Sequence, residues 1–231
     1  MDEQLKRIEY YEDLLNKAAD IIRKKPFLAK NLPSLQDCLK QLDEYYASES
    51  WKGDFSDEEK GLIPGDVRRG VLSEDGIYNV LEDGEEWTDE VVGSLMEKPY
   101  YLIDLLPERV QAEGKGRFFD VERCIISSQY AQALRRRFSG VVLKLYCYKD
   151  ISVFCGGEKY WKNDPSPEEI EEIIAGKEHC LFLLPEEETL ISLNNDDIFM
   201  TVYNLSASNR DLLEKLAGSE GLFLRRNKEN E

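Results

Sequence analysis

Apolar residues recur every three or four positions through the first forty-six residues, and this spacing predicts two amphipathic helices. The first is expected over residues 2–23 and the second over residues 32–46, with Pro26 ending the first. Because the connection between them is short, we expect the two helices to fold back as an antiparallel hairpin.

The pattern changes at Ser50, where glycines, a proline and aromatic residues follow one another. We expect an ordered loop here, anchored by Trp51 and Phe55. Ser73 is expected to cap a short helix that ends at Gly84. The following residues, 82–98, are rich in acids and predict a solvated linker.

From residue 99 the pattern alternates between strand-like and helix-like segments. One helix is expected at 118–126 and another from Ser208 to Gly218. A third is expected to begin with a capping box at Ser166 and to end at Gly176. Residues 141–147 fit either a helix or a strand, and the spacing that begins at Leu134 favours the helix. Strands are expected at 100–105, 151–155, 180–184, 189–193, 198–203 and 222–224.

These elements predict an α+β fold in two parts. A small all-helical module, a helical hairpin plus a short helix, is expected over residues 1–92. A linker over 93–98 leads to an α+β domain over 99–231, whose short spacers favour a mostly antiparallel sheet.

Charge and cysteine content narrow the functional classes. The chain has 47 acidic and 30 basic residues, a net charge of −17. So negative a surface repels nucleic acid and anionic membranes, so we expect neither as a partner. Five cysteines without a CxxC pair indicate buried thiols in a reducing compartment, and no signal-peptide or membrane-spanning pattern is seen. We therefore expect a cytoplasmic protein.

Candidate chemistry is sparse, and we expect no cofactor or metal. His179 precedes a predicted strand, and its neighbour Cys180 would point to the opposite face. The glycine pairs at 114–116 and 156–157 lack phosphate-loop spacing, and no carboxylate run has the spacing of a calcium loop. An enzyme using carboxylates or Mg²⁺ in the second domain remains an alternative, with candidate residues Glu158, Asp164, Asp196 and Asp197.

Two basic patches stand out from the acidic background, at 135–137 and at 225–228. They serve either solubility and salt bridges or as an anchor for the acidic segment 82–90. Trp87, within that segment, packs against its own domain or anchors a contact with a partner.

The stretch from Tyr45 to Asn79 contains the sequence RGVLSED followed by YN, preceded by Trp51, Asp54, Phe55 and Asp57. It resembles the bacterial family known as domain of unknown function 4298, over about residues 5–85. The resemblance implies a helical hairpin at the start of the chain, and the family offers no activity to carry over to this chain. Physically, Trp51 and Phe55 could cover the end of the hairpin, and Arg68 or Arg69 could pair with Asp54 or Asp57.

We expect a non-catalytic interaction or regulatory protein that binds a protein with a basic surface, a class that includes immunity and antitoxin proteins. The alternatives are the small-molecule enzyme above and a structural protein that self-associates. The candidate interaction surface comprises eight residues: Trp51, Asp54, Phe55, Asp57, Arg69, Asp75, Tyr78 and Trp87.

Overall fold

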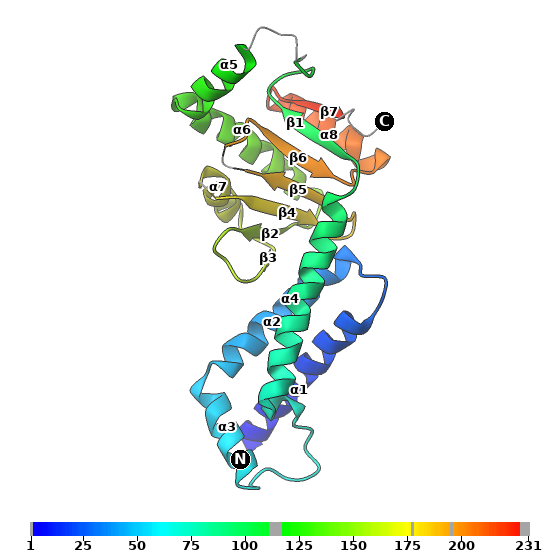
Figure 1. Ribbon diagram of the computed structural model, residues 1–231, viewed down its shortest axis with the longest axis vertical. Coiled ribbons are helices and arrows are strands. Elements are labelled where there is room, and N and C mark those ends of the chain that lie inside the picture. Colours follow the sequence, from blue (N-terminus) through cyan, green and yellow to red (C-terminus); the bar gives the residue numbers. More distant parts are fainter. Residues whose placement is uncertain (1, 111–116, 177, 195, 227–231) are drawn as a thin grey trace. The chain divides into compact units, whose positions relative to one another are not determined.

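The computed structural model describes residues 2–110, 117–176, 178–194 and 196–226. The chain divides into two compact units, Met1–Val92 and Gly93–Glu231 (Figure 1). The first is helical and the second carries an antiparallel sheet of seven strands, so the predicted α+β class is confirmed.

The N-terminal unit is built from four α-helices and two short 3₁₀ turns within the described residues. They are α1 (Asp2–Arg23), η1 (Ala29–Asn31), α2 (Leu32–Tyr46), α3 (Glu49–Glu59), η2 (Gly70–Leu72) and α4 (Glu74–Met96). The two predicted helices are confirmed as α1 and α2, which pack against each other. Their apolar stripes are buried between them, including Ile8, Leu35 and Leu42 at 0% exposure.

Helix α3 lies where the sequence predicts a loop, and that prediction is wrong. Ser48 caps the helix, since its side chain accepts a hydrogen bond from the Trp51 backbone nitrogen. Trp51 and Asp54 face inward one helical turn apart. Gly53 lies on the exposed side of the helix. Its cost to helix stability is therefore only that of its low helix propensity, about 1 kcal/mol relative to alanine. The glycines and the proline that follow Ser50 favoured a loop in the sequence, although Glu49–Glu59 forms a helix capped by Ser48.

Helix α4 is much longer than predicted and includes the segment expected to be an acidic linker. Its buried stripe continues past Gly84 through Trp87, Val91 and Leu95, so the helix does not end at that glycine. A Cβ at position 84 would lie 2.6 Å from Leu39 Cδ1. Gly84 is therefore a site of close helix packing, and residues 93–96 form the last turn of α4.

The second unit is organised around one sheet with the strand order β3-β2-β4-β5-β6-β1-β7. Every described pair of neighbouring strands is antiparallel. The strands are β1 (Tyr100–Asp104), β2 (Ser152–Cys155), β3 (Lys162–Asn163), β4 (Cys180–Leu184), β5 (Thr189–Leu193), β6 (Phe199–Tyr203) and β7 (Phe223–Arg226).

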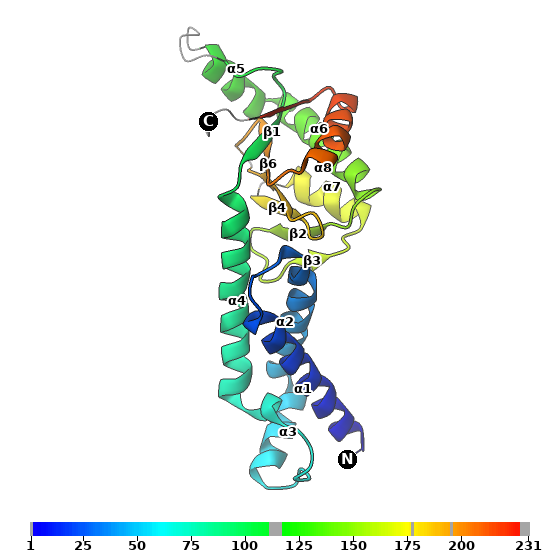
Figure 2. The ribbon, with the colours of Figure 1, turned by 90° about the vertical axis from the view of Figure 1, so that its right-hand side faces the viewer.

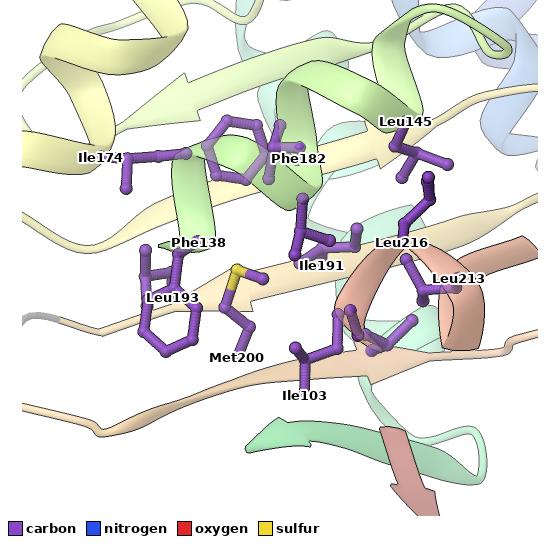
Figure 3. Packing of buried hydrophobic residues seen from close by; sticks show 14 of the residues in the cluster. Ile103, Phe138, Leu145, Ile174, Phe182, Ile191, Leu193, Met200, Leu213 and Leu216 are labelled. Atoms are coloured by element: carbon purple, nitrogen blue, oxygen red, sulfur yellow. The ribbon is translucent and has the colours of Figure 1, made fainter. Parts of the chain in front are cut away.

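Helices α6 (Gln129–Tyr146), α7 (Pro167–Ala175) and α8 (Ala207–Ser219) lie on one side of this sheet (Figure 2). The core lies between these helices and the sheet. Phe138 of α6 and Phe182 of β4 are both fully buried there, with Ile191 and Met200 from the neighbouring strands (Figure 3). Helix α5 (Arg117–Ile126) precedes α6 and has no fully buried residue.

Residues 141–147 are almost entirely helical, as favoured: α6 extends to Tyr146 and Cys147 caps it. The capping box at Ser166 is also confirmed, because Ser166 Oγ accepts from the Glu169 nitrogen and the Glu169 carboxylate accepts from the Ser166 nitrogen. The start of the last helix differs by two residues. Ser206, not Ser208, caps α8 through the Asn209 nitrogen at 3.3 Å.

Candidate functional site

Asp54 of α3 lies inside the N-terminal unit, where donors from two other helices surround its carboxylate. Arg7 of α1 donates from Nε at 2.9 Å and from Nη2 at 2.7 Å. The Tyr45 hydroxyl of α2 donates at 2.7 Å, and the Gln4 amide donates to Asp54 at 3.1 Å and to Asp57 at 3.0 Å. We call these five residues the Asp54 cluster. It joins α1, α2 and α3.

The pKa shifts within the cluster keep Asp54 and Arg7 ionised near neutral pH. Burial alone would raise the pKa of Asp54, but hydrogen bonds from Arg7, Tyr45 and Gln4 outweigh it, so the pKa lies below its ordinary value. Burial, and next the hydrogen bond to Asp54, raises the pKa of the Tyr45 phenol. The hydrogen bond to Asp54 likewise raises the pKa of Arg7. General acid–base catalysis needs a pKa near the working pH, so this arrangement favours structure over proton transfer.

The turn η2 is fixed by side chains from two helices. Glu12 of α1 accepts a hydrogen bond from the Val71 nitrogen at 2.8 Å, and Trp51 Nε1 of α3 donates to the Val71 oxygen at 3.0 Å. Directly after the turn, Ser73 Oγ accepts from the Gly76 nitrogen at 3.3 Å and caps α4, as predicted. The RGVLSED segment therefore sets where α4 begins.

The Asp54 cluster and the start of α4 give structural contacts to Asp54, Asp57 and Ser73 of the motif. Residues 8–93 match the family named Domain of unknown function (DUF4298). The resemblance expected over residues 5–85 is thereby confirmed. The DUF4298 match extends through Trp87 and Val91 of α4 and stops before the first strand of the sheet. No match was found among curated proteins or solved structures.

Three of the candidate surface residues in the DUF4298 region are buried and cannot contact a partner. Trp51 is 6% exposed, Asp54 1% and Trp87 2%. The Trp51 ring stacks on Phe55 at 5.1 Å, and the Trp87 ring packs against Phe27 at 5.5 Å. The alternative in which Trp87 packs against its own unit is the observed one.

The expected ion pairs of the DUF4298 region have different partners. Arg69 pairs with Glu58 at 2.6 Å, and Arg68 pairs with Asp13 at 2.9 Å. The expected partner Asp54 pairs with Arg7 of α1 instead. Three candidates are half-buried: Phe55, Asp57 and Arg69. The remaining two, Asp75 and Tyr78, are exposed, and both lie on α4.

The solvent side of α4 carries eight exposed carboxylates, and α4 contains no lysine or arginine. They are Glu74, Asp75, Glu82, Asp83, Glu85, Glu86, Asp89 and Glu90. In the part of the chain that the structure describes, none of the eight forms an ion pair. We call this surface the α4 acidic face. Continuing the stripe of Ile77 past Gly84 would have predicted it from the sequence.

A groove of about 660 Å³ opens in the second unit between α5, α6, α7 and the β5–β6 turn. Apolar side chains such as Ile125 and Leu134 line it together with the charged Arg136, Glu171 and Asp197. Arg135 also lines it and donates to the Asn194 oxygen at 2.8 Å. Burial lowers the pKa of Arg135, although nearby acids act in the opposite direction.

The carboxylates named for an enzyme do not gather at one point. The carboxylates Glu158, after β2, and Asp196 and Asp197, after β5, lie at one end of the strands. Asp164 follows β3 and lies at the opposite end. In the described ranges no group of three His, Cys, Asp or Glu residues could hold a metal ion. His179 lies beside a strand end, with Nε2 2.9 Å from Ser192 Oγ.

The described part of the basic patch expected at 225–228 is partly buried and partly exposed. Arg225 forms an ion pair with buried Asp104, Arg226 is exposed, and position 228 lies outside the described residues. An anchor role of these arginines for the acidic segment stays a prediction.

Two of the five free cysteines, Cys124 and Cys147, are exposed, so the expectation of buried thiols is wrong for them. Among the described helices, none has the length and apolar character needed to cross a membrane.

Proposed function

We propose that this chain is a non-catalytic interaction module that binds a protein with a basic surface through the α4 acidic face. The observation that carries the proposal is the absence of any neutralising partner for the eight carboxylates of this face within the described residues. Residues 1–92 contain 23 acidic and 12 basic residues, a difference of −11, so α4 supplies most of the excess charge.

The rest of the unit supports this role by holding α4 in place. Trp87 and Val91 are buried on the inner side of the helix, and Gly84 lets it approach α2 closely. A rigid helix presents its charges without losing further conformational entropy on binding. Tyr78, 57% exposed on the same helix, adds an aromatic contact of the kind enriched at interfaces.

The test neutralises part of the face and compares it with an equal change elsewhere. The triple variant Glu82→Gln, Glu86→Gln, Asp89→Asn removes three charges from α4. The control Glu9→Gln, Asp20→Asn removes two exposed charges from α1, and Glu44→Gln removes a third from α2. Binding of a fluorescent oligo-arginine peptide to the full chain is measured by anisotropy at low and moderate salt.

We expect the α4 variant to weaken binding about tenfold, because each exposed ion pair contributes roughly 0.2–1 kcal/mol. The control should weaken binding less than threefold, and added salt should reduce the difference between the variants. Equal weakening by both variants would show a response to net charge alone and would refute a defined binding face. A protein captured from host lysate should follow the same ranking.

The groove of the second unit favours a second candidate function, the binding of a small anionic molecule. Its size is typical of ligand sites. Its lining combines apolar side chains with polar ones, among them the cations Arg135 and Arg136 and the carboxylates Glu171 and Asp197. The fluorescent probe 1-anilinonaphthalene-8-sulfonate combines an aromatic body with a negative charge. We expect Arg136→Glu to reduce its binding several-fold and the adjacent Arg137→Glu, which lies outside this groove, to change it little. Equal effects of both variants would exclude the groove as the site.

A further inference from the structure

Two cysteines face each other across adjacent strands of the second unit. The antiparallel register of β2 and β4 places Cys155 directly opposite Cys180. The next residues along the two strands are Gly156 and His179. The Gly156 nitrogen donates to the His179 oxygen at 3.0 Å, so Gly156 and His179 form a hydrogen-bonded pair of the ladder. Because the two types alternate along an antiparallel ladder, Cys155 and Cys180 form a non-hydrogen-bonded pair, with Cα atoms roughly 4.5 Å apart.

This spacing fits a disulfide without movement of the backbone. Disulfides usually join Cα atoms about 4.4–6.8 Å apart, and residues directly opposite in a ladder point to the same face. Both thiols now point to other acceptors: Cys180 Sγ lies 3.8 Å from the Leu193 oxygen, and Cys155 Sγ lies 4.0 Å from Glu178 Oε2. Rotation about the Cα–Cβ bonds is the change that pairing requires.

We propose that Cys155 and Cys180 are a redox modification site, which forms a reversible disulfide between β2 and β4 on exposure to a low-molecular-weight disulfide such as oxidised glutathione. The Cys155 thiolate attacks the reagent, which releases one thiol and leaves a mixed disulfide. The Cys180 thiolate then attacks the Cys155 sulfur and releases the second thiol. The protein loses two electrons and the reagent gains them, and the two protons end on the released thiols. The site does not depend on the role of the α4 acidic face.

The order of attack follows from exposure, since Cys155 is half-buried and Cys180 is fully buried. The thiolate is the attacking species, so its pKa governs the rate. Burial, followed by the charges of Glu178 and Glu158, raises the pKa of Cys155, while the Gly156 backbone N–H acts in the opposite direction.

Burial, and next the neighbouring Cys155, raises the pKa of Cys180 to about 12, and Arg135 opposes this. Both thiols are therefore mostly protonated at neutral pH. We expect disulfide formation to be slow at pH 7 and about tenfold faster at pH 8.

The test uses the full chain in its native state. After incubation with oxidised glutathione, free thiols are blocked and the protein is digested with trypsin, which places the five cysteines on five different peptides. Mass spectrometry should show residues 150–159 linked to residues 178–210. A parallel sample is oxidised in urea, where Cys155 closes a loop of 8 residues to Cys147 more readily than one of 25 to Cys180.

We expect the Cys155–Cys180 link to exceed the Cys147–Cys155 link at least tenfold in the native sample, and the order to reverse in urea. The variant Cys147→Ser should keep the native link, and Cys180→Ala should leave Cys155 as a mixed disulfide with glutathione. The proposal is overturned if native wild-type protein carries glutathione on Cys155 without the cross-strand link, or links it to Cys147. That wild-type result decides the matter even if Cys180→Ala fails to fold.

Discussion

Replacing Asp54 by asparagine tests the Asp54 cluster most directly, because the two side chains have nearly the same shape. The substitution removes the negative charge and places an amide donor among the donors of Arg7 and Tyr45. Breaking one partner of a buried ion pair costs about 3–5 kcal/mol. The Arg7 side chain is 35% exposed and can recover some hydration, so we expect the lower end, about 3 kcal/mol.

The loss should appear locally in hydrogen exchange of the full chain. A cost of about 3 kcal/mol corresponds to roughly a hundredfold loss of protection in α1, α2 and α3, since about 1.4 kcal/mol is tenfold. Peptides from α6 in the second unit give an internal reference. The matched control is Asp57→Asn, on the same helix and bonded to the same Gln4, but 36% exposed. A loss from Asp54→Asn no larger than that from the control would refute the reasoning.

The same variant predicts a pH dependence with a definite sign. The folded-state pKa of Asp54 is lowered, so its contribution to stability is present above the unfolded value of about 3.9 and is lost as the pH falls through the folded value. The difference in unfolding free energy between wild type and Asp54→Asn should be constant from pH 7 to about 4 and shrink below. Urea unfolding followed by Trp51 and Trp87 fluorescence, in a Trp161→Phe background, measures it. A difference that grows on acidification would contradict the assignment.

Three further predictions concern the stability of single elements. Gly84→Ala should destabilise the N-terminal unit by about 1–3 kcal/mol, because the added methyl group would overpack against Leu39. Gly93→Ala has nothing within 4 Å and should stabilise helix α4 by up to about 1 kcal/mol. Shifts of the melting temperature with the same sign in both variants would contradict this prediction. Ser206→Ala should cost about 1 kcal/mol in urea unfolding and Ser208→Ala less than half of that; the reverse ranking would restore the sequence-based cap. Asp104→Asn should cost about 3 kcal/mol and reduce amide protection in β1 and β7, and unchanged protection would argue against its ion pair.

Sequence patterns predicted the elements whose signals are local. The stripes of α1 and α2 repeat without interruption, and Ser166, Pro167 and Glu169 carry every part of a helix start, so these elements could be read directly. Helices α3 and α4 were misjudged because each contains a glycine in its interior. At Gly53 the glycine is merely tolerated, whereas at Gly84 the fold needs its small size.

The partners of charged side chains could not be read from the sequence. Asp54 pairs with Arg7, which lies 47 positions earlier, and Glu12 reaches Val71 across 59 positions. Such choices depend on how three helices meet, and no spacing rule within one helix contains that information. For the same reason the interaction surface was placed on Trp51 and Asp54, which the fold turns inward.

The two edges of the sheet bear on how copies of this chain could associate. Edge strand β3 has only two residues, and edge strand β7 ends in Arg225 and Arg226. Short or charged edges discourage the addition of a further strand from another molecule. Contacts through helices and side-chain surfaces are therefore favoured over edge pairing in any homo-oligomer of this chain, and fibrous aggregation through backbone pairing is disfavoured.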